Sequence, residues 1–156
     1  YMVGAFSAVV IVAFAVSIPM KATVADGQET TTADNASIEA VEDDMHEFME
    51  YVFQPTYKRL KDAVAVESKD NATWKIIKSD ALILAESGNL LLGRSPESDA
   101  EAWIKTSVKV REHGGQLYRA AKAKDPEAMQ AAYLMMIENC NACHQKYSAG
   151  DPQLKP

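Results

Sequence analysis

Basic residues are scarce relative to acidic ones in this sequence, which has 16 Lys and Arg residues against 22 Asp and Glu residues among its 156. The formal net charge is -6 at pH 7 with neutral histidines. A protein that binds nucleic acid needs a basic surface to displace the counterions of the phosphate backbone. The composition therefore disfavours nucleic acid as the partner of this chain.

Two further features are missing: an internal repeat, and an alternation of apolar and polar residues long enough for a β-strand. Instead, apolar residues recur at every third or fourth position in four separate blocks after residue 36. Hydrophobic residues make up 47% of the chain, which is enough to form a core. The sequence therefore predicts an all-α fold.

No charged residue lies between Met2 and Met20. Such a run is typical of a secretory signal peptide or of an N-terminal membrane anchor. Both interpretations put the rest of the chain outside the cytoplasm, in the periplasm or another extracytoplasmic space. We expect four regions: a signal peptide or anchor over residues 1–25, a flexible linker over 26–36, a helical domain over 37–150 and a tail over 151–156.

The first helix is predicted to run from Ser37 to about Val66, with a kink at Pro55 because proline removes a backbone hydrogen-bond donor. The other three helices are expected between start and stop signals: from Asn71 to Gly93, from Ser95 or Ser98 to about residue 121, and from Asp125 to residues 147–150. Loops of a few residues favour an antiparallel up-down-up-down four-helix bundle.

The only two cysteines of the chain lie in the motif Cys140-Asn141-Ala142-Cys143-His144. Covalent haem attachment requires two thiols that add across the two vinyl groups of one porphyrin, followed by an imidazole that reaches the iron. On a helix, Cys140, Cys143 and His144 share one face. The motif therefore predicts one haem c per chain, with Cys140 and Cys143 as attachment points and His144 as iron ligand.

Three other interpretations of the cysteine pair fit less well. A thioredoxin-type pair stands at a helix start after a strand, whereas this pair ends a helix in a chain without predicted strands. A structural zinc site needs four ligands, and the two other histidines, His46 and His113, do not form a spaced pair. A disulfide across a two-residue gap would distort a continuing helix, although an extracytoplasmic location permits oxidation.

An exported four-helix chain with Cys-x-x-Cys-His near the end of its last helix resembles the cytochrome c-prime family and its low-spin relatives, the class II c-type cytochromes. The resemblance rests on "CNACHQKY" and covers about residues 37 to 148. It implies a haem c at one end of the bundle, held by Cys140 and Cys143, with His144 as the proximal ligand.

The sixth iron ligand is predicted on the first helix, whose start lies beside the end of the last helix in an antiparallel bundle. Counting about 19 residues along the last helix to His144, at a rise of about 1.5 Å per residue, reaches the level of Met45 and Met49. A methionine at an interface between helices usually only fills space in the core. A methionine sulfur at this level would, however, complete a His/Met pair of iron ligands. The family resemblance favours Met49 over Met45, and His46 is expected to face solvent.

Two groups of residues are interpreted as structural. Gly114 and Gly115 lower helix stability, so close helix packing is the expected reason for them, while Gly88 is expected to leave room for the porphyrin ring. A basic cluster on the first helix is interpreted as a solvated face: Lys58, Arg59 and Lys61.

No set of acid, base and nucleophile accompanies the haem motif, so we do not expect an enzyme. We expect single-electron transfer through a low-spin haem, with redox proteins as partners, and allow for membrane attachment through residues 2–20 and for a homodimer. The alternative is a five-coordinate haem that binds nitric oxide or carbon monoxide. In that case Met45 and Met49 would be packing residues, and Phe48 or a leucine would cap the iron.

Overall fold

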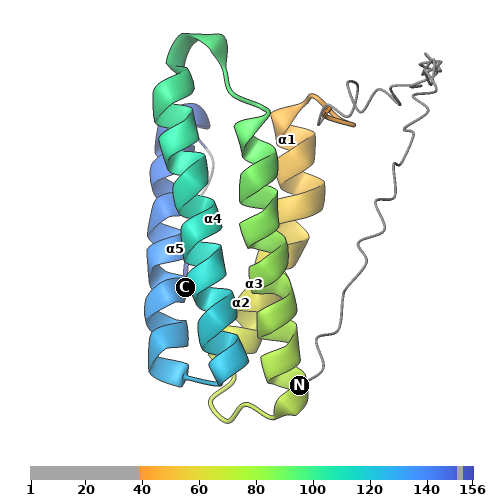
Figure 1. Cartoon of the computed structure of the whole chain (residues 1–156), viewed down its shortest axis with the longest axis vertical. Helices are drawn as coiled ribbons and strands as arrows, with labels where there is room; N and C mark the ends of the chain where they lie inside the picture. Colours follow the sequence, from red (N-terminus) through yellow and green to blue (C-terminus); the bar gives the residue numbers. More distant parts are fainter. Residues whose placement is uncertain (1–38, 151–152) are drawn as a thin grey trace, which may run out of the picture. The chain divides into compact units, whose positions relative to one another are not determined.

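Four long helical segments run alternately up and down along the chain (Figure 1). The structure is a computed structural model that describes residues 39–150 and 153–156, all of which belong to one compact unit. The predicted all-α bundle of four antiparallel helices is confirmed. The expected signal peptide or anchor and the expected linker lie outside the described residues. Within the described ranges, no helix is both long and apolar enough to cross a membrane.

The first helical segment consists of three consecutive parts, α1, η2 and α2: Met45–Phe48, Met49–Phe53 and Gln54–Ala65. It begins later than the predicted Ser37, because the side chain of Asp44 accepts hydrogen bonds from the backbone N–H groups of His46 and Glu47 and so caps the helix there. Val41, which the apolar pattern placed inside the helix, is fully exposed.

A π-helical turn, η2, precedes Pro55 in the first helical segment. Proline has no N–H and its ring crowds the preceding turn, so the regular α-helical pattern cannot continue through it unchanged. The wider π turn is one of the known ways to accommodate such an interruption, and the Thr56 hydroxyl also donates to the Val52 carbonyl at 2.8 Å. A π turn thus interrupts the regular α-helix just before Pro55, the residue at which the sequence predicts a kink.

The second helix, α3, spans Asn71–Leu92 and is followed by Gly93, as predicted. Its cap is Asp70 rather than the predicted Asn71, since the Asp70 carboxylate accepts from the N–H and the hydroxyl of Thr73 at 2.7 and 2.8 Å. Aspartate and asparagine are both favourable N-cap residues. Asp70 defines the start of α3 because its side chain is the one that reaches Thr73.

The third helix, α4, spans Ala100–Ala123 and follows a short 3₁₀ turn, η3, at Glu97–Asp99. The sequence predicts Ser95 or Ser98 as its cap, but neither serine caps α4. Asp99 occupies the cap position, but its carboxylate does not accept from α4. It instead accepts from Tyr147 and pairs with Lys146, both at the end of the fourth helix.

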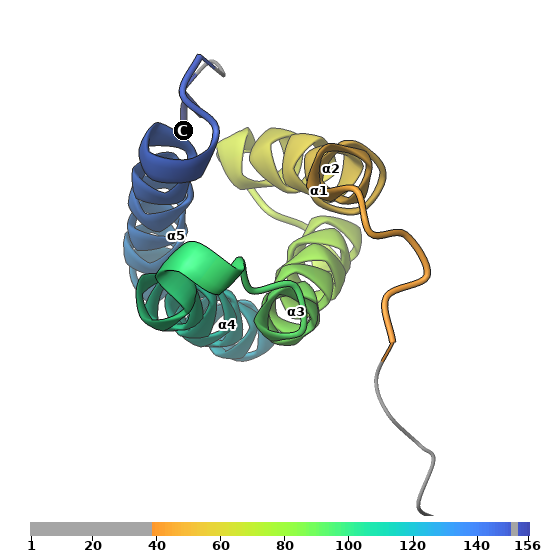
Figure 2. The same ribbon diagram turned by 90° about the horizontal axis from the view of Figure 1, so that it is seen from above.

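The fourth helix, α5, spans Pro126–Tyr147 and confirms its predicted start, because Asp125 accepts from the N–H groups of Glu127 and Ala128. Around the ring of helices, α3 packs on α2, α4 on α3 and α5 on α4. Few close backbone contacts join α5 to the first helical segment in the ring of helices that Figure 2 shows from above. Side chains of both segments, among them Leu60 and Tyr133, belong to one buried cluster.

The α3 and α4 helices approach each other closely at two glycines. A Cβ atom on Gly88 would lie 2.7 Å from the backbone nitrogen of Arg111, and one on Gly114 would lie 2.9 Å from the backbone of Ala85. The prediction of close packing is thus confirmed for Gly114. The expectation that Gly88 leaves room for a porphyrin is wrong, because the backbone of α4 takes that room.

Candidate haem attachment site

The motif residues lie in the last two turns of α5, where Cys140, Cys143 and His144 share a face through their spacing of three and four residues. All three side chains are partly buried, and the two cysteines are free thiols. Cys140 packs against the main core, whose fully buried members include Leu60 of α2 and Tyr133 of α5. The face of α5 that carries the motif thus continues into the core.

Burial disfavours the thiolate form of both cysteines. Burial, and secondarily the neighbouring Cys143, raise the pKa of Cys140 to about 12, and burial also raises the pKa of Cys143. A thiol–disulfide exchange site requires the opposite, since its attacking cysteine has a lowered pKa. The electrostatic environment therefore argues against the redox-pair interpretation.

The imidazole of His144 has a buried nitrogen, Nδ1, that finds no hydrogen-bond partner in the described part of the chain. Buried polar atoms nearly always have a partner, and leaving one without costs about 1–3 kcal/mol. A histidine that the protein itself does not satisfy remains available for an external group, and imidazole is the commonest metal ligand among side chains. This observation, together with the two thiols on the same face, fits a covalently held haem.

Met45 and Met49 lie at the start of the first helical segment and are both partly buried. They pack against a second, smaller core cluster, called here the end cluster, which also contacts Tyr147. Because Tyr147 follows His144 by three residues, the fold brings both methionines to the end of the bundle that holds the haem motif. The buried residues of the end cluster are Phe48, Leu91, Trp103 and Val110.

The two remaining histidines have partners on their own helices. The side chain of His46 is 78% exposed and lies 3.5 Å from Glu50. The expectation that His46 faces solvent is therefore confirmed. His113 is partly buried in α4 and lies 3.4 Å from Gln116. In residues 39–150 and 153–156, no three His, Cys, Asp or Glu side chains are close enough together to hold a metal ion.

Contacts between α4 and α5 fix the end of the motif helix. The rings of Trp103 and Tyr147 meet edge to face with centroids 5.0 Å apart, and the Trp103 indole donates to the Leu91 carbonyl at 2.7 Å. The hydroxyl of Tyr147 donates to the Asp99 carboxylate at 2.9 Å. Sequence reasoning missed Asp99, whose role depends on a partner 48 positions away.

A second missed residue is Arg94, which lies between α3 and η3. Its guanidinium lies 4.0 Å from the centroid of the Phe48 ring and donates to the Leu90 carbonyl at 2.9 Å. A cation over an aromatic face is attracted to the electrons of the ring. Arg94 thus covers the end cluster beside the methionines, and no spacing rule links it to Phe48.

Lowering the pH is expected to loosen the end of α5. The Lys146 ammonium, followed by the Tyr147 hydroxyl, lowers the pKa of the Asp99 carboxyl. A group whose pKa is lower in the folded state stabilises above its unfolded pKa, and that contribution disappears as the pH falls through the folded pKa. Urea unfolding at a series of pH values should show a loss below about pH 4 that is smaller in Asp99→Asn. Identical losses in the two proteins would contradict this role of Asp99.

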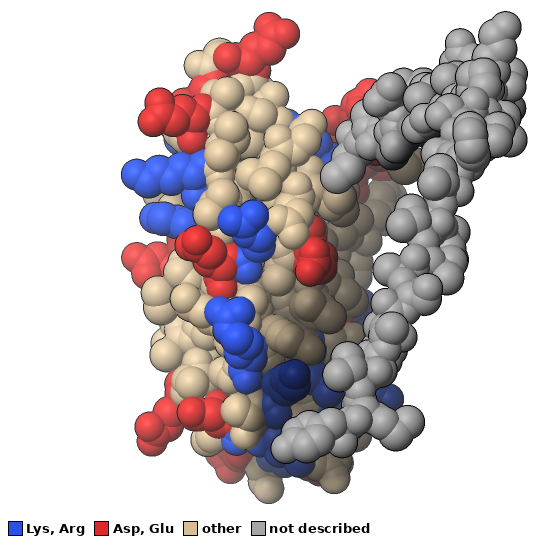
Figure 3. All heavy atoms as spheres, in the orientation of Figure 1, with Lys and Arg blue, Asp and Glu red and all other residues tan. Residues whose placement is uncertain are grey.

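The surface carries both charge signs. On the face shown in Figure 3, Lys and Arg side chains lie among Asp and Glu side chains along the length of the bundle. All three members of the basic cluster on α2 have defined partners, which the interpretation as a solvated face did not foresee. Lys58 donates to Gln54 Oε1 at 2.8 Å, Arg59 pairs with the buried Asp80 at 2.8 Å, and Lys61 donates to the Lys155 carbonyl at 3.0 Å.

Comparison of the chain with protein-family models and with curated proteins finds no match.

Proposed function

We propose that this chain is an extracytoplasmic class II c-type cytochrome that transfers single electrons through one haem c. The main support is the position of Cys140, Cys143 and His144 on one face at the end of the last helix. At the same end of the bundle, Met45 and Met49 pack in the end cluster. The thiols would form the two thioethers and His144 would bind the iron.

When bound, the haem would supply an iron that accepts and releases one electron. The chain contributes a fixed ligand, because the end of α5 is held by Trp103 and Asp99 and carries His144 on a regular helix. A methionine sulfur on the opposite side would favour the reduced state. The apolar residues of the end cluster would exclude water and thereby influence the reduction potential.

The second candidate function is a five-coordinate haem that binds nitric oxide or carbon monoxide. It is favoured by Phe48, which is only 6% exposed and lies between the two methionines in sequence, whereas Met45 and Met49 are partly buried. A buried phenylalanine that caps the iron would leave an apolar pocket without a protein ligand. We rank this function second because two sulfur atoms lie at the same end of the first helical segment.

The other parts of the proposal rest on the sequence. The charge-free run over residues 2–20 supports export with or without retention of an anchor, and the net charge of -6 supports protein redox partners over nucleic acid. We do not propose an enzymatic reaction.

The decisive experiment is the intact mass and spectrum of the full chain after production in a host that matures c-type cytochromes. We expect the mass of the chain to increase by that of one haem. We expect the spectrum of the reduced protein to be that of a thioether-linked haem. Cys140→Ser and Cys143→Ser should each retain one thioether, which shifts the pyridine haemochrome band, and the double variant should retain no covalent haem. A wild-type chain that carries no haem mass under these conditions would overturn the proposal.

A further inference from the structure

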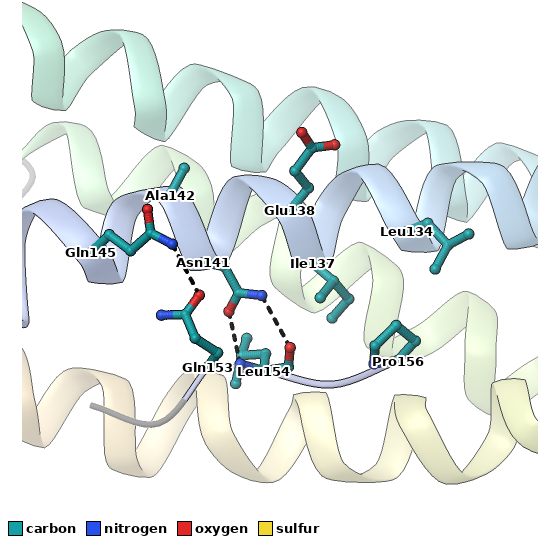
Figure 4. Close-up of a pocket in the computed structure, with 9 residues that line it drawn as sticks. All are labelled: Leu134, Ile137, Glu138, Asn141, Ala142, Gln145, Gln153, Leu154 and Pro156. Carbon is teal, nitrogen blue, oxygen red and sulfur yellow. Dashed lines mark hydrogen bonds between the residues drawn. The ribbon is translucent and has the colours of Figure 1, made fainter. Parts of the chain in front are cut away.

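The segment formed by residues 153–156, called here the C-terminal strap, runs along α5 beside the haem motif (Figure 4). Asn141 holds it through both ends of its amide, because Leu154 N–H donates to Asn141 Oδ1 at 2.7 Å and Asn141 Nδ2 donates to the Leu154 carbonyl at 3.0 Å. A side chain that pairs with both polar groups of one backbone residue fixes the position of that residue.

The other side of the strap is attached to α2. The hydroxyl of Tyr57 donates to the Lys155 carbonyl at 2.6 Å, and the same carbonyl accepts from Lys61. The side chain of Leu154 packs against the main core, as do Tyr57 and Cys140. The strap therefore connects α2 to α5, the two helices whose backbones have few close contacts.

Two properties place the strap next to the thiol chemistry. Asn141 is the residue between Cys140 and Ala142 in the motif, and Tyr57, which holds the strap from α2, packs against the same core cluster as Cys140. The strap also forms one wall of a hollow of about 530 Å³ along the outer side of α5, with Gln153, Leu154 and Pro156 opposite Ile137 and Asn141. Cys140 and Leu154 of the strap thus pack against the same core cluster, on either side of Asn141 in the contacts that join α5 to the strap.

We propose that Asn141 is a positioning residue that fastens the C-terminal strap over Cys140, so that the strap is undocked while Cys140 forms its thioether and docked afterwards. In that step the thiol adds across a vinyl double bond: a sulfur–carbon bond forms, and the thiol hydrogen passes to the other vinyl carbon. The inference rests on the proposed haem attachment, because covering Cys140 matters to function only if this thiol reacts.

The strap is suited to such opening. It is held by one leucine side chain and a few hydrogen bonds, whereas the helices are held by the core. Local opening of a segment with so few contacts requires much less free energy than unfolding of the whole domain. The bundle can therefore stay folded while the strap is undocked.

The test is the rate at which iodoacetamide alkylates Cys140 in the full chain produced without haem, with Cys143 as internal reference and peptide mass spectrometry as readout. Asn141→Leu, and a chain that ends at Gly150, are expected to react at Cys140 roughly tenfold faster, the factor that two lost hydrogen bonds imply. Asn141→Asp keeps the acceptor for the Leu154 N–H and should restore part of the protection. Gln145→Ala, which loses only a 3.3 Å contact with Gln153, should react like the wild type.

Circular dichroism identifies variants that lose helix, and Tyr57→Phe then provides a milder change that removes only the hydrogen bond to Lys155. Cys140 rates that do not change in Asn141→Leu and in the shortened chain would overturn the inference. Equal acceleration of Cys140 and Cys143 would also overturn it, because it would indicate general loosening. Absence of haem from the matured wild type would instead contradict the proposed function, independently of strap docking.

Discussion

Met49→Ala is expected to convert the haem-loaded protein from low spin to high spin in the ferrous state and to open the iron to carbon monoxide. Loss of the Met49 sulfur would leave His144 as the only protein ligand of the iron. Alanine fills less volume than methionine, so the end cluster would gain space for a small ligand on the same side. The absorption spectrum of the reduced protein, with and without carbon monoxide, measures both effects.

The matched control is Met45→Ala, one turn earlier on the same helix and in contact with the same cluster. It is expected to stay low spin and to ignore carbon monoxide, because the resemblance to the class II c-type cytochromes favours Met49 over Met45 as the iron ligand. High spin in Met45→Ala alone would assign the ligand to Met45. A wild type that is already high spin, or two variants that both remain low spin, would contradict methionine ligation.

Gly114→Val is expected to be strongly destabilising, with a loss of about 3 kcal/mol or more in the free energy of unfolding. Even a single Cβ atom at this position would lie 2.9 Å from the backbone of Ala85, and backbone atoms of a packed helix cannot move aside individually. Valine adds two methyl groups to that conflict, so α3 and α4 would have to separate.

Gly115→Ala serves as the control, since its added Cβ would meet only the flexible end of Arg119 at 3.3 Å. It is expected to stabilise the helix by up to about 1 kcal/mol, the difference in helix propensity between glycine and alanine. Urea unfolding of both variants, followed by circular dichroism, gives the two values. Destabilisation of similar size at both positions would show that close approach to Ala85 is not the determining factor.

The helices and their order could be predicted from the apolar spacing, because four amphipathic helices with short loops have few ways to bury their apolar faces. Helix starts were less predictable. Asp44, Asp70 and Asp99 all precede helices, but the first two cap them whereas Asp99 binds α5 instead. Local sequence offers the same carboxylate in each case, and only the folded neighbours decide which partner it takes.

The motif on α5 could be predicted because its chemistry depends on residues within one helical turn. The same short spacing makes the motif specific for haem attachment. The contacts that surround it link distant positions, such as Arg94 with Phe48 and Asn141 with Leu154. Arg59 shows the limit most clearly, since its pairing with the buried Asp80 depends on how α2 and α3 are aligned. Such pairings leave no periodic signal in a single sequence.

The π turn at Met49–Phe53 contains one residue more than an α-helical turn needs over the same stretch. Deletion of a single residue there would let an unbroken α-helix form and would rotate everything before it by about 100° relative to α2. Met45 would then leave its present position on the end cluster, while Leu60 and the rest of α2 would keep theirs. A one-codon change in this turn is thus enough to alter which side chains of the first helix pack on the end cluster, without any substitution in the core.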